Sequence, residues 1–208
     1  MFGLMTPPWT RAEAVFSASF VLLVLALGLE PAVREALRYD RELIAAGEAW
    51  RIVTGNFVHL GVGHLVLDVL GLALLLLFFR DVFSPRLWLL ATLAGALAVG
   101  AGLWFLNPGL PGYLGISGVL HTLLFAGLLL SFRHSPLING VVFAAMSARL
   151  WSEQQPDYDV LQMQDVIGGA IAVDAHLYGA LASLPVVALC WRASQARQAR
   201  FRAADSAR

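Results

Sequence analysis

The segment GYLGISGVLHTLLFAGLLL, residues 112–130, places a serine between small residues at the start of an otherwise apolar run. Ser117 follows Gly115 and Ile116 and precedes Gly118, and His121 comes one helical turn later. At the opening of a helix a backbone N–H has no intrahelical acceptor, so the serine N–H can donate to another group. A run this apolar is typical of a membrane helix, in which polar side chains are costly and therefore informative.

The whole chain is as apolar as this segment suggests. Of its 208 residues, 59% are hydrophobic and 13% are charged, whereas a soluble domain is about half apolar and about a quarter charged. A helix needs about 20 residues to cross the hydrocarbon core. The composition predicts an all-α polytopic membrane protein with six transmembrane helices in a single domain, residues 1–208. The six apolar segments are 14–29, 57–79, 87–106, 117–132, 136–151 and 167–190.

The distribution of arginine, the only strongly basic residue type present, predicts the orientation. Arginines occur in the N-terminus (about residues 1–12), in the loops after the second and fourth segments, and in the tail (about 192–208). By the positive-inside rule, we expect both termini to be cytoplasmic. Most acids, including Glu153, fall on the opposite side, where loop 31–56 is expected to form interfacial helices. We expect the bilayer and membrane proteins as partners and, without a basic face, no nucleic acid.

Polar residues in the apolar segments are candidates for function. Taken alone, each has a structural explanation, since a serine in a membrane helix usually bonds its own backbone or a neighbouring helix. The predicted topology, however, places Ser117, His64 and His176 together in the outer half of the helix bundle. His176 would lie six to nine residues past the start of its segment, about 9–14 Å deep. The polar residues in these segments are His64, Asp68, Ser117, His121, Asp174 and His176.

A serine beside a histidine is typical of nucleophilic catalysis, because the imidazole takes the hydroxyl proton as the serine attacks. Gly118 would let a second backbone approach, and the Ser117 N–H could donate to an oxyanion. The α/β-hydrolase elbow does not fit, since Val119 replaces its last glycine, and no H-E-x-x-H zinc motif is present. A stripe of small residues in the last segment would pack closely against another helix; it comprises Ala172, Ala175, Gly179 and Ser183.

These motifs together resemble the rhomboid intramembrane serine proteases. The resemblance rests on Gly115-Ile116-Ser117-Gly118, on AHLYG at 175–179 and on EAWRIVTGNFVHLGVGHLVLD at 48–68. It implies a six-helix rhomboid bundle in which Ser117 is the nucleophile and His176 the general base, without a third acid. It also implies that His64 helps to form the oxyanion hole. Such chemistry uses no cofactor and no metal.

Within the family, SGVLH (117–121), ARLWSEQ (148–154) and VDAHLYGAL (173–181) resemble the rhombosortase subgroup. That subgroup is associated with bacterial proteins that carry a C-terminal Gly-Gly sorting tail. The resemblance therefore implies an inner-membrane endopeptidase that cleaves a transmembrane or C-terminal sorting segment of membrane-anchored substrates.

Two positions depart from the family pattern. Asp68 stands where rhomboids usually carry an oxyanion-hole asparagine. It would either be protonated and donate to the oxyanion, or be ionised and orient His64 one turn away. His121 stands where many rhomboids carry a tyrosine against the catalytic histidine, and we expect it to support His176. Trp50 and Arg51 match a loop motif and are expected to anchor the outer loop at the membrane interface.

Two other functions are compatible with the same residues. One is an inactive rhomboid-like protein that binds membrane helices, an interpretation that the Asp68 departure leaves open. The other is a metal-binding membrane carrier that uses histidine and aspartate side chains, although the chain offers no thiolate pair. Its ligands would be His59, His64, Asp68, His121 and His176.

Overall fold

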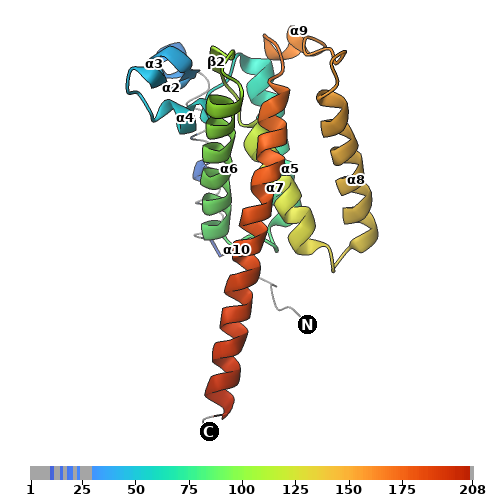
Figure 1. Cartoon of the computed structure of the whole chain (residues 1–208). Helices are drawn as coiled ribbons and strands as arrows, with labels where there is room; N and C mark the ends of the chain where they lie inside the picture. The colour runs from blue at the N-terminus through green and yellow to red at the C-terminus, as the bar shows by residue number, and fades with distance from the viewer. Residues whose placement is uncertain (1–9, 12–14, 16–17, 21–22, 24–29, 207–208) are drawn as a thin grey trace.

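The computed structural model describes residues 10, 11, 15, 18–20, 23 and 30–206, with side chains described as far as residue 192. The first predicted apolar segment, 14–29, therefore lies outside the described residues except at isolated positions. The rest of the chain forms mostly helices (Figure 1). The elements are α2 (Pro31–Leu37), β1 (Tyr39–Asp40), α3 (Arg41–Ala45), α4 (Arg51–Thr54), the 3-10 helix η1 (Gly55–Phe57), α5 (Val62–Phe79), α6 (Pro85–Leu106), β2 (Gly112–Tyr113), α7 (Ser117–Ser131), α8 (Pro136–Glu153), α9 (Gln164–Ile167) and α10 (Val173–Ser206).

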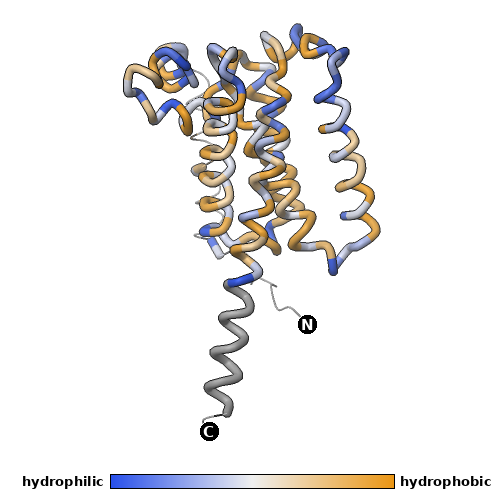
Figure 2. The backbone as a smooth tube through the Cα atoms, viewed as in Figure 1, coloured by the Kyte–Doolittle hydropathy of each residue, from blue (hydrophilic) through white to orange (hydrophobic). Residues whose placement is uncertain are grey.

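Three of the described helices are long and apolar enough to cross a membrane, namely Val62–Phe79, Pro85–Leu106 and Val173–Arg192. Hydrophobic residues line these helices, and hydrophilic residues gather mainly in the loops and helix ends (Figure 2). On α5, apolar side chains such as Leu70, Leu74 and Leu77 are exposed, as expected for a surface that faces lipid. The predicted fifth segment forms α8, and the count of six spans stays a prediction.

Helix α7 is the centre of the bundle and packs against α5, α6, α8 and α10. Its 15 residues rise only about 22 Å, less than the hydrocarbon core. Val119, Leu123 and Ala126 on this helix are completely buried. Because neighbouring helices cover it, α7 does not need to match the thickness of the bilayer by itself.

Two helices begin later than the apolar pattern predicts. Helix α5 begins at Val62 rather than at 57, so His59 lies in the turn before the helix and not on it. Helix α10 begins at Val173 rather than at 167, because the separate helix α9 ends at Ile167 and is capped by Gly168, whose φ of 87° is left-handed. His64 and His176 therefore lie in the first turns of their helices, closer to the helix ends than predicted. At the other end, α10 continues as a helix to Ser206, through most of the predicted tail.

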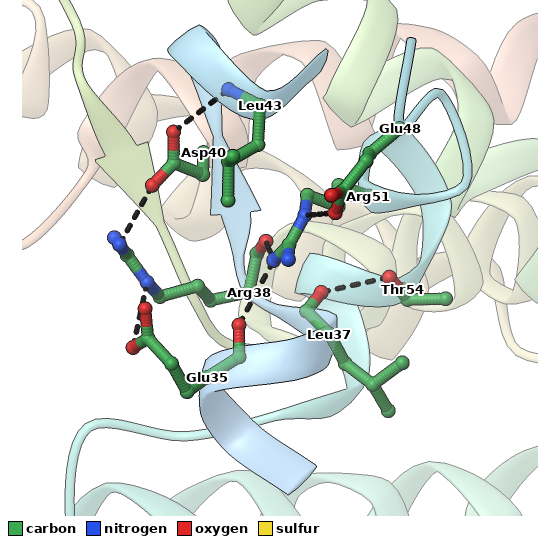
Figure 3. Close-up of polar contacts among 8 residues, drawn as sticks. All are labelled: Glu35, Leu37, Arg38, Asp40, Leu43, Glu48, Arg51 and Thr54. Carbon is green, nitrogen blue, oxygen red and sulfur yellow. Dashed lines mark hydrogen bonds and ion pairs between the residues drawn. The ribbon is translucent and has the colours of Figure 1, made fainter. Parts of the chain in front are cut away.

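The segment before α5 folds as three short α-helices, the 3-10 helix η1 and a strand, which support the turn before α7. Strand β1 pairs antiparallel with β2, with Tyr39 opposite Tyr113, and the Gly115 N–H donates to Gly55 O at 3.2 Å. Arg51 holds this segment together: its guanidinium donates to the carbonyl oxygens of Glu35 and Arg38, each at 2.9 Å (Figure 3). The expectation that Arg51 anchors the loop at the membrane interface is wrong, because Arg51 is buried.

Candidate active site

The hydroxyl of Ser117 and the imidazole of His176 are in direct contact. His176 Nε2 lies 3.0 Å from Ser117 Oγ. Ser117 is the first residue of α7 and His176 the fourth of α10, so both belong to helix openings on the same side of the bundle. Ser117 is half-buried and His176 is buried. Two polar groups that the sequence separates by 59 residues therefore share a hydrogen bond.

The contact depends on the close approach of α7 and α10. A Cβ on Gly179 would lie 1.8 Å from the Gly118 carbonyl oxygen, and a Cβ on Gly118 would lie 2.7 Å from the Ala175 carbonyl oxygen. No larger residue fits at either place without moving a backbone. Thr122 adds a hydrogen bond from its Oγ1 to Gly179 O at 2.8 Å. The small-residue stripe on α10 thus faces α7, and the contribution of Gly118 to this contact is packing.

The turn before Ser117 is held by several groups. Gly115 has a φ of 122°, and a Cβ there would lie 2.7 Å from the His64 ring, so this position requires glycine. The Tyr113 hydroxyl donates to Gly115 O at 2.6 Å. Burial raises the pKa of Tyr113, which keeps its hydroxyl protonated and able to donate. The turn therefore presents Ser117 in one defined position at the helix opening.

Three polar nitrogens lie around one carboxylate oxygen of Asp68. The Ile116 N–H donates to Asp68 Oδ2 at 3.2 Å. The Nε2 atoms of His64 and His59 lie 3.2 Å and 3.1 Å from the same oxygen. Leu60 donates its N–H to His64 Nδ1 at 3.4 Å, so the hydrogen of His64 lies on Nε2, the ring nitrogen that is close to Asp68. The arrangement is that of an accepting carboxylate, which is the ionised alternative of the two considered for Asp68.

The ring of His121 stacks on the ring of His176, with centroids 4.5 Å apart and planes 20° apart. Its Nδ1 is 2.8 Å from Ser117 O, and because a carbonyl oxygen only accepts, His121 Nδ1 carries the hydrogen. The stacked ring covers one face of the His176 imidazole, and its supporting role stays a prediction.

Glu153, the last residue of α8, contacts His176 on the side opposite Ser117. Its Oε2 lies 2.9 Å from His176 Nδ1, and its Oε1 accepts from Arg149 Nε at 2.8 Å. Glu153 is buried. The sequence analysis placed it only among the acids of the outer side. A sequence signal that could have singled out Glu153 is its i, i+4 spacing from Arg149, which places both residues on one helix face. That face lies at the same end of the bundle as the start of the helix that carries His176.

A cavity of about 420 Å³ adjoins Ser117, His176 and His64. Its remaining walls are mostly apolar, and the segment before α10 contributes Met163, Ile171 and the small residues Gly169, Ala170 and Ala172. Among the described residues, no group of three or more His, Cys, Asp or Glu side chains is arranged to hold a metal ion. Asp174 lies away from this cavity and accepts from Asn107 Nδ2 at 2.5 Å.

Comparison with protein families matches the rhomboid domain to residues 46–193, well over half of the chain. This chain belongs to the rhomboid family. The match contains every residue of the site described above. Comparison with curated proteins gives no match.

Membership in the family supports a coarse description of this rhomboid. Rhomboids are generally intramembrane serine proteases, and the apolar helices of this chain agree with a membrane protein. The helical bundle is also consistent with the rhomboid architecture. The roles of individual residues, the subgroup and the substrate are proposals that the geometry has to support.

Proposed function

We propose that this rhomboid is an active intramembrane serine endopeptidase in which Ser117 is the nucleophile and His176 the general base. The observation that carries the proposal is the 3.0 Å contact between Ser117 Oγ and His176 Nε2 beside a cavity. This distance is within reach for direct proton transfer. An inactive protein that only binds membrane helices would have no need for this contact.

The proposed reaction has two halves. Ser117 Oγ attacks the carbonyl carbon of the scissile bond while its proton moves to His176 Nε2, and the carbonyl oxygen becomes an oxyanion. His176 then gives that proton to the leaving nitrogen, the C–N bond breaks, and an acyl-enzyme remains. A water molecule attacks the acyl carbon and transfers a proton to His176. The ester bond breaks, and Ser117 recovers its proton.

The proposed donors to the oxyanion are backbone N–H groups in the first turn of α7. The N–H groups of Ser117 and Gly118 belong to the set that an α-helix leaves without intrahelical acceptors. His64 borders the same cavity and is the proposed side-chain donor. Its Nε2 lies 3.2 Å from Asp68 Oδ2 before substrate binds, so Asp68 would compete with the oxyanion for its hydrogen.

The proposed substrates are membrane-anchored proteins with a transmembrane or C-terminal sorting segment near a Gly-rich motif, as in the rhombosortase subgroup. A helical peptide bond is shielded by its own helix, and glycine lowers the cost of unwinding by about 1 kcal/mol per residue relative to alanine. The small residues Gly169, Ala170 and Ala172 at the cavity leave room for an extended peptide.

Labelling with a fluorophosphonate probe tests the proposed function. The purified wild type is expected to form a covalent adduct on Ser117, and Ser117→Ala is expected to form none, because the probe reacts only with an activated serine. Mass spectrometry of the labelled peptide would identify the site. A wild type that stays unlabelled under conditions that preserve the fold would contradict the proposal.

For orientation we propose a bacterial inner-membrane protein with both termini in the cytoplasm, on the basis of the arginine distribution. Reporter fusions after Arg208 and within residues 152–165 are expected to give opposite signals, cytoplasmic for the first and periplasmic for the second. Fusions that give the same signal would contradict the six-span prediction, in which one span lies between these two positions.

A further inference from the structure

The carboxylate of Glu153 completes a line of hydrogen-bonding groups that starts at Ser117. The line runs from Ser117 Oγ to His176 Nε2 at 3.0 Å and from His176 Nδ1 to Glu153 Oε2 at 2.9 Å. It ends at Arg149, whose Nε donates to Glu153 Oε1 at 2.8 Å. The Glu153 side chain is 2% exposed and that of Arg149 is 49% exposed. The carboxylate is thus buried between a ring and a cation that reaches solvent.

The chemistry of a carboxylate decides which nitrogen of His176 carries the hydrogen. An ionised carboxylate only accepts, and the pairing with Arg149 favours the ionised form. His176 Nδ1 must therefore carry a hydrogen, which leaves Nε2 with a lone pair directed at the Ser117 hydroxyl. This is the tautomer that a general base needs.

We propose that Glu153 is a positioning residue that holds His176 in this tautomer and stabilises the imidazolium formed when Ser117 attacks. The inference rests on the proposed function, and it extends the catalytic pair, for which the family resemblance implied no third acid, to a Ser-His-Glu arrangement. Glu153 gives up and receives no proton in the reaction. It acts through its hydrogen bond and its charge.

A purely structural role for Glu153 makes a different prediction. Helix α8 has few buried residues among those described, and they are Asn139, Leu150 and Glu153. Glu153 ties the outer end of α8 to α10. Asn139 ties the inner end to α7, with its Nδ2 2.9 Å from Ser131 Oγ. If Glu153 served only to hold α8 in place, loosening α8 at Asn139 should impair the site in a similar way.

Glutamine at position 153 separates these roles because it keeps the shape and removes the charge. The carboxylate uses its two oxygens for two donors, His176 and Arg149. An amide has one oxygen and one NH₂ group, so one of the two donors must face another donor. If the NH₂ group faces His176, it favours the tautomer with the hydrogen on Nε2, which cannot accept the Ser117 proton.

The test measures fluorophosphonate inactivation of the purified full chain in detergent micelles, resolved into the maximal rate kinact and the half-saturating concentration KI. For Glu153→Gln we expect kinact to fall by about 10²- to 10⁴-fold, the range in which loss of the orienting acid in a serine protease triad falls, with KI unchanged. The small probe needs no substrate docking, so a fall confined to kinact reports activation of Ser117. Asn139→Leu is the matched control on the same helix, and its kinact is expected to stay near that of the wild type.

Glu153→Asp keeps the inference testable if the glutamine variant does not fold. Aspartate keeps the charge but is shorter by one methylene, so we expect a lower kinact with a smaller loss than for glutamine. Equal kinact in the wild type and in a folded Glu153→Gln or Glu153→Asp would overturn the proposed role of Glu153 and leave the proposed function in place. Equal losses in Glu153→Gln and Asn139→Leu would also overturn it, in favour of α8 docking. A wild type that does not react would overturn the proposed function itself.

Discussion

Ser117→Ala and His176→Ala are each expected to abolish cleavage of a membrane-anchored reporter, with a loss in kcat of about 10⁴- to 10⁶-fold. The reason is the shared hydrogen bond of 3.0 Å: without the hydroxyl no acyl-enzyme forms, and without the imidazole the hydroxyl keeps its proton. The measurement is initial cleavage rate by purified protein in lipid vesicles, with product identity checked by mass spectrometry.

The double variant of Ser117 and His176 distinguishes a catalytic unit from two independent losses. Residues that act as one unit are strongly non-additive, so the double variant is expected to be no slower than either single variant. Ser131→Ala is the matched control: Ser131 is on the same helix, but its Oγ donates to Gly127 O at 2.6 Å. It should cleave at close to the wild-type rate. Full activity of Ser117→Ala would contradict the protease mechanism.

The sequence predicted that Ser117 and His176 meet better than it predicted the starts of the helices that carry them. Ser117 and His176 stood out because polar groups are rare in apolar helices and topology placed them on the same side. The helix starts were wrong because hydropathy does not distinguish an apolar turn from a helix. Val58 is completely buried but precedes α5, and Ile171 lies in the turn before α10.

The burial of Glu153 and Arg51 was not predicted, for a related reason. Both are charged residues at or near predicted outer loops, where charge needs no explanation, and no sequence pattern marks them as buried. Their burial arises from contacts between distant segments: Glu153 with His176, and Arg51 with the carbonyl oxygens of Glu35 and Arg38. The pairing of Tyr39 with Tyr113 is likewise a contact between distant segments. Strands of two residues are too short to show an alternating pattern in the sequence.

Asp68 and Glu153 are both buried acids beside the site, yet replacing each by its amide is expected to change activity to a different extent. All three close contacts of Asp68 go to one oxygen, Oδ2, whereas Glu153 serves a different donor with each oxygen. An asparagine oxygen can therefore take the place of Asp68 Oδ2 and accept from Ile116. Its NH₂ group would replace Oδ1, which none of these contacts uses. Rhomboids usually carry asparagine at this position, and such an NH₂ group can donate to an oxyanion.

Asp68→Asn is accordingly expected to retain substantial activity, whereas Asp68→Leu should lose about 10- to 1,000-fold in kcat, the scale of losing an oxyanion donor or its orienting partner. Leucine leaves the Ile116 N–H, one residue before the nucleophile, without its acceptor and releases the His64 ring. The measurement is the reporter cleavage rate of both variants, with Asp157→Leu, an exposed acid of the outer side, as the control that should not change. Because the leucine and asparagine variants both remove the charge, a loss in the first alone assigns the effect to hydrogen bonding. An unchanged rate in Asp68→Leu would mean that Asp68 only fills a polar niche beside the site.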